Sequence, residues 1–187
     1  MHVDGRCRAR LVAVVLASLL GTGAAAAGEA DSSTEPAGMT ASGLPVPRFV
    51  SLKADRVNLR TGPGTEYPTT WVFRRAGLPL EVVSEFEAWR QVRDSEGTTG
   101  WVLQSFLSGR RTALVVPWEV KPEKPPPQVP IRMSDSESTR PVALVEAGVI
   151  ANVHGCDGRW CSVSIGDYRG YLPQKDLWGI YEGEIVK

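Results

Sequence analysis

The sequence predicts an all-β protein: an N-terminal signal peptide, then two tandem small β-barrels joined by a Pro-rich linker. Three observations favour this fold class. Short β-prone runs are separated by Gly, Asp, Asn and Ser turn signals about every 8–12 residues. A spaced set of residues recurs in the two halves of the chain. No segment after residue 30 shows a helical hydrophobic period. Units this small close into partly open barrels, because closure removes exposed strand edges.

The first segment has the layout of an export signal. Three arginines within residues 1–10 precede the apolar run 11–20, and the small residues GTGAAAA follow. A bilayer span needs about 20 apolar residues, so the run is too short to serve as an anchor. We expect a signal peptide over 1–27, cleaved after Ala27 or, as a second choice, after Ala30. The mature protein is then periplasmic or secreted, with no membrane span.

Composition excludes several classes of protein. The 187 residues carry 21 basic and 21 acidic side chains, and this balance provides no field for a polyanion, so we expect no nucleic acid partner. The apolar share of 42% is enough for a packed core. Neither a G-x-S-x-G motif nor a glycine-rich phosphate loop occurs, and we expect no cofactor.

Proline and small polar residues set the expected boundaries. Residues 28–48 are small, polar and Pro-bearing, which predicts a flexible leader. Six of the fourteen residues from 117 to 130 are proline, which is typical of an extended linker. We therefore expect a first barrel over 49–116, a linker over 117–128 and a second barrel over 129–182.

The two barrels are predicted to be copies of one unit. Residues 76–78 (AGL) align with 147–149 (AGV), and the same offset places Trp89 on Trp160. After a deletion of one residue, Gly100-Trp101 aligns with Gly170-Tyr171. The segments 104–107 and 174–177 each fit a single 3₁₀ turn.

The first copy carries the residues of a known family. Residues 57–68 read VNLRTGPGTEYP, and they are followed by the Gly77 turn, Trp89-Arg90-Gln91-Val92, and Gly100-Trp101-Val102. This order is similar to bacterial SH3-like domains, the small barrels of exported cell-wall proteins. The second copy departs from the pattern, because residues 133–139 replace the Gly-Pro loop. The resemblance implies a binding or targeting module for peptidoglycan or an envelope protein, with no chemistry of its own.

Strand alternation predicts where a ligand binds. If Val92 and Val102 face the core, then Trp89 and Trp101 point to the opposite face of neighbouring strands and lie within cross-strand reach. Rigid aromatic side chains provide contact area at low entropic cost. The candidate binding residues are Arg60, Tyr67, Trp71, Trp89, Trp101, Trp160 and Tyr171. The alternative is that these aromatic faces pack against the linker or against the other copy.

The two cysteines of the mature chain are expected to form a disulfide. Cys156 and Cys161 flank an Asp-Gly turn, and a cross-strand pair there lies within disulfide range. The equivalent pair in the first copy is Glu85 and Arg90. A Cys156 nucleophile activated by His154 is the alternative. Residues two positions apart on one strand, however, lie nearly 7 Å apart, which is beyond the hydrogen-bond reach that a Cys–His pair needs. A zinc site matches no common ligand spacing.

These inferences predict an exported, non-enzymatic binding module for peptidoglycan or another envelope component. A periplasmic protein–protein adaptor is the alternative, and a cysteine-dependent wall hydrolase is a weaker one. We expect no catalytic residues and no metal.

Overall fold

A computed structural model describes residues 40–187, which fold into two antiparallel sheets with no α-helix among these residues. The strands of the first sheet are β1 (Arg48–Leu52), β2 (Val57–Arg60), β3 (Thr69–Phe73), β4 (Pro79–Phe86), β5 (Trp89–Arg93), β6 (Thr99–Leu103) and β7 (Leu107–Ser108). Those of the second are β8 (Thr112–Val115), β9 (Gln128–Arg132), β10 (Pro141–Glu146), β11 (Ile150–Asp157), β12 (Trp160–Ile165), β13 (Tyr168–Pro173), β14 (Leu177–Trp178) and β15 (Ile185–Val186). The all-β prediction is confirmed.

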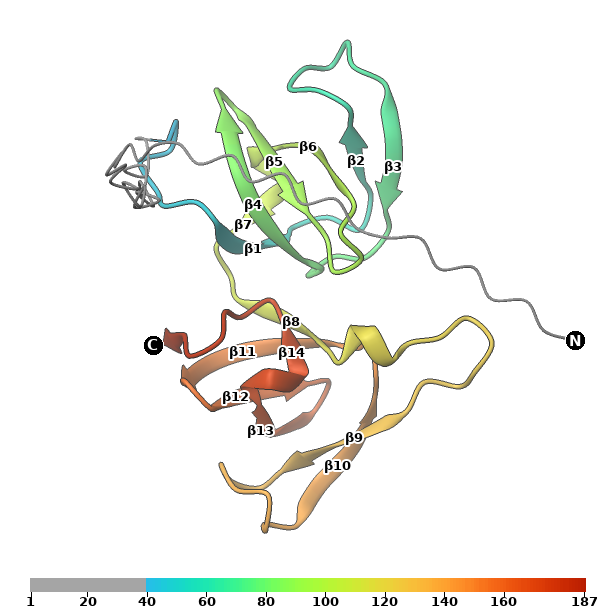
Figure 1. Ribbon diagram of the computed structural model, residues 1–187, viewed down its shortest axis with the longest axis vertical. Coiled ribbons are helices and arrows are strands. Elements are labelled where there is room, and N and C mark those ends of the chain that lie inside the picture. Colours follow the sequence, from blue (N-terminus) through green and yellow to red (C-terminus); the bar gives the residue numbers. More distant parts are fainter. Residues whose placement is uncertain (1–39) are drawn as a thin grey trace, which may run out of the picture. The chain divides into compact units, whose positions relative to one another are not determined.

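The duplication extends to the order of the strands. The first sheet runs β3-β2-β6-β5-β4-β1-β7, and the second runs β10-β9-β13-β12-β11-β8-β14, which is the same order with each strand replaced by its copy. Figure 1 shows each set curling into a small barrel. Single 3₁₀ turns follow β6 and β13, at Gln104–Phe106 (η1) and Gln174–Asp176 (η3), as the sequence predicts. Another 3₁₀ turn, η2, covers Pro117–Glu119.

Each barrel has its own apolar core, and alternation along the strands decides which side chains enter it. Val92 and Val102 are fully buried in the first core, as Val163 and Leu172 are in the second. The residues that alternate with them are half-buried, including Trp89, Trp101, Trp160 and Tyr171. The predicted orientation of these aromatic residues, away from the core, is therefore confirmed.

The repeated glycine of the Gly-Trp and Gly-Tyr pairs is required by close packing. A Cβ on Gly100 would lie 2.6 Å from Cγ of Leu59 and 2.8 Å from the carbonyl oxygen of Arg60. A Cβ on Gly170 would lie 2.4 Å from the carbonyl oxygen of Arg132. Only glycine allows β6 and β13 to approach β2 and β9 this closely.

The Pro-rich segment occupies a different place from the one the sequence predicts. The strand β8 pairs with β11 and β14 in the second sheet, although the sequence division assigns residues 112–115 to the first barrel. The Pro-rich segment therefore connects two strands of one barrel, β8 and β9, and the chain passes between the barrels at residues 109–111. A short apolar run such as 112–115 reads as a strand, but its residues do not reveal which sheet it joins.

Residues of the two sheets contact each other directly. The ring of Phe49, on β1, lies 5.1 Å from the ring of Trp178 and 4.7 Å from that of Tyr181. The Tyr181 hydroxyl donates to Oε1 of Glu81 at 3.0 Å, and burial together with this carboxylate raises the pKa of Tyr181. Phe49, Trp178 and Tyr181 therefore form the aromatic contact between the copies, and Trp89 and Trp101 lie outside it.

The predicted signal peptide, both cleavage positions and the leader up to residue 39 lie outside the described residues. The part of the leader that is described contacts the first barrel: the backbone N–H and the hydroxyl of Ser42 both donate to Glu85, each at 2.8 Å. Between residues 40 and 187, no helix has the length and apolar character needed to cross a membrane.

Candidate binding grooves

Each barrel has a groove beside one of its hairpins. The groove of the first barrel, about 310 Å³ in volume, is bordered by the β5–β6 hairpin, and the groove of the second, about 560 Å³, by the β12–β13 hairpin. The first is lined mainly by Arg56, Arg60, Trp89, Leu103 and Phe106. The second is lined mainly by Glu137, Arg159, Trp160, Pro173, Lys175 and Glu182.

The two grooves are related by the duplication. Trp89 is paired with Leu103 across the first hairpin, and Trp160 is paired with Pro173 across the second. Both tryptophans begin their strands, and both are half-buried. The fold thus places an indole at the same position of each copy, with an apolar side chain opposite it.

The grooves differ in the residues around the indole. The first has a second aromatic side chain, Phe106, which is 40% exposed, and the equivalent residue of the second copy is Asp176. Burial raises the pKa of the Asp176 carboxyl. The first groove is lined by two arginines and no acidic residue, whereas Glu137 and Glu182 balance Arg159 and Lys175 in the second. The first groove is therefore aromatic and cationic, and the second is of mixed charge.

Trp101 and Tyr171 lie beside the grooves without lining them. Trp101 is paired with Gln91, two residues along from the pair of Trp89 and Leu103, so the two indoles are diagonal neighbours on one face. Tyr171 is paired with Ser162 in the same way. The predicted cross-strand proximity holds in both copies.

Arg60 both lines the first groove and holds the adjacent loop. Its Nη1 donates to the carbonyl oxygens of Thr65 at 3.0 Å and Tyr67 at 2.6 Å. In the second copy, Arg132 donates from Nη1 to the carbonyl oxygen of Thr139 at 2.8 Å. An arginine at this position thus fixes the loop after β2 or β9 even though the two loops differ in sequence.

Two of the predicted residues lie elsewhere. The ring of Tyr67 packs on the loop backbone, where a Cβ on Gly62 would be 2.4 Å from its Cδ1, and the ring lines neither groove. Trp71 lies on the edge strand β3, is 59% exposed, and lines a separate cleft. Sequence proximity to the loop does not decide which side of the barrel these aromatic residues face.

A family model described as "Bacterial SH3 domain" matches residues 53–109 and 126–179, which together make up more than half of the chain. The chain belongs to the bacterial SH3 domain family. The two matched stretches correspond to the two barrels, so the protein carries two tandem bacterial SH3 domains, as the sequence predicts.

Solved structures give a remote likeness to this pair of bacterial SH3 domains. NlpC2 from Trichomonas vaginalis is 14% identical, with a TM-score of 0.31, over 71% of this chain and 48% of that one. An NlpC/P60 family protein from Bacillus cereus ATCC 10987 is 13% identical, with a TM-score of 0.30, over 70% and 55%. The chain thus spans about half the length of these proteins. No curated protein matches the chain.

The central hairpin of each bacterial SH3 domain is held by a different cross-strand pair at one position. Cys156 and Cys161 are paired across β11 and β12 and joined by a disulfide, as predicted. Glu85 and Arg90 are paired across β4 and β5, with Arg90 Nε 3.0 Å from the carboxylate. The side chain of Glu85 is only 1% exposed. A covalent bond in one domain therefore replaces a buried ion pair in the other.

The environment of Glu85 favours its charged form. Burial alone would raise its pKa, but hydrogen bonds from Ser42 and Arg48, with the positive charge of Arg48, lower the pKa of Glu85 to about 2. The carboxylate thus links the leader residue Ser42, the strand β1 and the central hairpin.

The second domain's cysteines and histidine do not combine into a reactive group. Both sulfurs are consumed by the disulfide, so neither is a free thiolate able to attack a substrate or bind zinc. His154 Nε2 lies 2.8 Å from the hydroxyl of Ser164 on the neighbouring strand, in an exposed position. Within residues 40–187, no three His, Cys, Asp or Glu side chains are placed to hold a metal ion.

Arg56 and Phe106 are among the side chains of the first groove that sequence reasoning missed. Phe106 follows the Gly-Trp-Val strand in the family pattern, and its place in the predicted 3₁₀ turn was the signal that could have shown its exposure. Arg56 lies in the connection between β1 and β2, where nothing in its own neighbourhood indicates a groove.

Proposed function

We propose that this protein is an exported, non-catalytic module that binds cell-wall peptidoglycan, and that the groove around Trp89 in the first domain is its binding site. The proposal rests on one observation above the others. This groove combines two aromatic side chains, Trp89 and Phe106, with two arginines, Arg56 and Arg60.

The chemistry of that groove suits a wall fragment. The faces of indole and phenyl rings take up the apolar faces of sugars and short peptides. Guanidinium groups bind carboxylates through paired hydrogen bonds, and peptidoglycan stem peptides carry carboxylates. The loop held by Arg60 borders the same groove, so the loop and the side chains that line the groove are positioned together.

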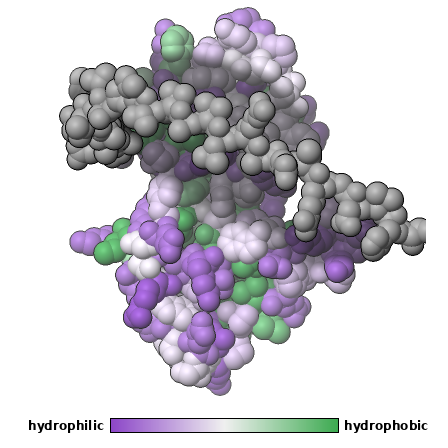
Figure 2. All heavy atoms as spheres, viewed as in Figure 1, coloured by the Kyte–Doolittle hydropathy of each residue, from purple (hydrophilic) through white to green (hydrophobic). Residues whose placement is uncertain are grey.

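The face of the second domain that Figure 2 shows supports binding in grooves rather than on a broad apolar face in that domain. In the view of Figure 2, the second domain shows mainly hydrophilic residues, with apolar ones in small separate groups. A large exposed apolar patch would instead indicate a protein or membrane surface.

Export is part of the proposal and rests on two independent features. The first 27 residues have the composition of a signal peptide. The disulfide between Cys156 and Cys161 belongs to an oxidising compartment such as the periplasm.

Co-sedimentation with purified peptidoglycan sacculi tests the proposal. The chain from residue 28 onward, which contains every strand of both sheets, is compared with Trp89→Ala. Trp160→Ala is the matched control, because Trp160 occupies the same position in the other domain. We expect Trp89→Ala to reduce the retained fraction at least fivefold and Trp160→Ala to leave it nearly unchanged.

Absence of retention for the unaltered protein would overturn the wall-binding proposal. Capture of a specific envelope protein that depends on Trp89 would then favour the adaptor role. Equal retention of all three proteins would show that the wall is bound outside the Trp89 groove.

A further inference from the structure

The outer edge of strand β3 has no partner within the described part of the chain. β3 is the terminal strand of the first sheet and pairs only with β2. Its residues, Thr-Thr-Trp-Val-Phe, include none of the prolines or lysines with which proteins usually block a sheet edge. The N–H and C=O groups along this edge are available to another strand.

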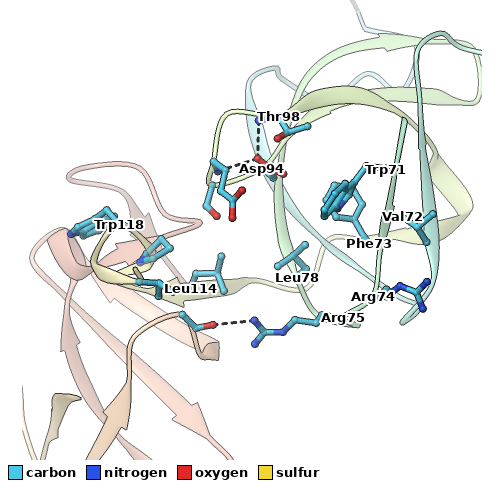
Figure 3. A pocket seen from close by; sticks show the side chains of 15 residues that line it. Trp71, Val72, Phe73, Arg74, Arg75, Leu78, Asp94, Thr98, Leu114 and Trp118 are labelled. Carbon is cyan, nitrogen blue, oxygen red and sulfur yellow. Dashed lines mark hydrogen bonds between the residues drawn. The ribbon is translucent and has the colours of Figure 1, made fainter. Parts of the chain in front are cut away.

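A cleft of about 950 Å³ lies beside the last three residues of β3 and the two residues that follow the strand. Five consecutive residues line it, from Trp71 to Arg75. The first three belong to β3, and alternate residues of a strand point to opposite faces, so a cleft that touches Trp71, Val72 and Phe73 reaches the strand's edge. Figure 3 shows this arrangement, with Trp71 and Phe73 on one side of the strand and Val72 and Arg74 on the other.

Polar residues of the β5–β6 turn, from Asp94 to Thr98, form one wall of the cleft, and the wall opposite β3 is apolar. It is formed by Leu114, Pro117, Trp118 and Val120 of the second domain, and Trp118 and Val120 are 48% and 45% exposed. A strand inserted along β3 would therefore have the backbone of β3 on one side and apolar side chains of the second domain on the other.

Trp71 is an uncovered member of a core-facing row. It lies on the same face of β3 as Phe73, which is 4% exposed, yet Trp71 itself is 59% exposed. The row thus passes from core to solvent within two residues. An apolar side chain of an incoming strand would cover the indole and extend the row.

One cation of the cleft is free to recognise an acidic group. Arg75 donates to the carbonyl oxygen of Gly148 at 3.1 Å, and Asp94 accepts from the backbone N–H groups of Glu96 and Thr98. Among residues 40–187, Arg74 has no carboxylate partner within ion-pair distance. Glu96 also lines the cleft, and Arg74 is the group at this end of the edge that can pair with a carboxylate.

We propose that this cleft is a second binding site, which takes an extended peptide segment of another protein as an additional strand on β3. About five residues would match the length of β3, at roughly 3.3 Å per residue. An apolar side chain of the peptide covers Trp71, and an acidic residue or the C-terminal carboxylate pairs with Arg74. The site is separate from the Trp89 groove and does not depend on the wall-binding proposal.

Selection from a phage-displayed library of random heptapeptides tests this inference on the chain from residue 28 onward. We expect the enriched peptides to alternate apolar and polar residues and to carry an acidic group near one end. Their binding should weaken at least tenfold in Trp71→Ala and at least threefold in Arg74→Gln. Leu144→Ala, which alters an apolar side chain 58% exposed on the equivalent edge strand β10, and Trp89→Ala are the controls and should bind normally.

Backbone methylation of the best peptide separates strand addition from side-chain binding. N-methyl groups at alternate residues remove the N–H donors that face β3, and we expect them to abolish binding, whereas methylation of the other set is tolerated. The inference is overturned if no peptide is enriched above a Trp71→Ala/Trp118→Ala double variant. It is equally overturned if both methylated peptides bind like the parent, or if Leu144→Ala or Trp89→Ala removes binding.

Discussion

At the scale of single residues, the carboxylate of Glu85 stabilises the first domain only while it is charged. It accepts from Ser42 and lies within ion-pair distance of Arg48 and Arg90. Its pKa in the folded protein is about 2, below the ordinary value of 4.5. A carboxyl with a lowered folded pKa adds stability that is complete above its unfolded pKa and is lost as the pH falls towards the folded one.

We therefore predict that the free energy of unfolding decreases as the pH falls from about 5 to about 2. Glu85→Gln should cost about 2 kcal/mol at pH 7, because charge-assisted hydrogen bonds to a buried carboxylate are lost. The variant should also lose much of the dependence on pH in this window. Denaturant unfolding at several pH values measures both effects, with the exposed Glu123→Gln as control. A Glu85→Gln variant with wild-type stability at pH 7 would contradict the account.

Residue roles were predictable only where alternation along a strand decides them. The orientation of Trp89 and Trp101 follows from the burial of Val92 and Val102, so the sequence was sufficient. The bonds of Arg60 to the carbonyl oxygens of its own loop depend on the path of that loop. The placement of Trp71 in another cleft depends on which end of the barrel is open, and strand periodicity carries no information about this.

At the scale of elements, the packing of β6 on β2 requires a residue without a side chain at position 100. We predict that Gly100→Ala lowers the stability of the protein by about 1–3 kcal/mol, because its Cβ would overlap backbone and core atoms. Gly109→Ala is the matched control, since a Cβ there meets nothing within 4 Å. Thermal unfolding followed by circular dichroism compares the two variants, and equal melting temperatures would refute the packing argument.

The pairing of most strands could be predicted from the duplication, but the pairing of β8 could not. The offset that aligns Trp89 with Trp160 also aligns the Glu85–Arg90 pair with the disulfide, and both pairs occur in the sheets. The strand β8 was assigned to the wrong barrel because proline content marked the boundary. Proline removes a backbone hydrogen-bond donor but does not show whether its segment joins domains or strands.

At the scale of the whole molecule, Phe49, which is 9% exposed, lies at the aromatic contact between the two domains. We predict that Phe49→Ala costs about 3 kcal/mol and separates the unfolding of the two domains into two steps. Removing the ring leaves Trp178 and Tyr181 without their aromatic partner. Differential scanning calorimetry should show one transition for the unaltered protein and for Phe106→Ala, an exposed aromatic control. A single transition in Phe49→Ala would contradict coupling through this contact.

The central claim is that the first domain binds peptidoglycan at the Trp89 groove, and the six tryptophans of the chain provide the most direct measurement. Each indole N–H gives its own signal in a ¹H–¹⁵N NMR spectrum, assigned by single Trp→Phe variants. On titration with soluble muropeptides, we predict that the Trp89 signal shifts most and that of its diagonal neighbour Trp101 less. The signals of Trp160 and Trp178 should stay in place. Unshifted signals at millimolar muropeptide, or shifts confined to Trp71 and Trp118, would contradict the claim.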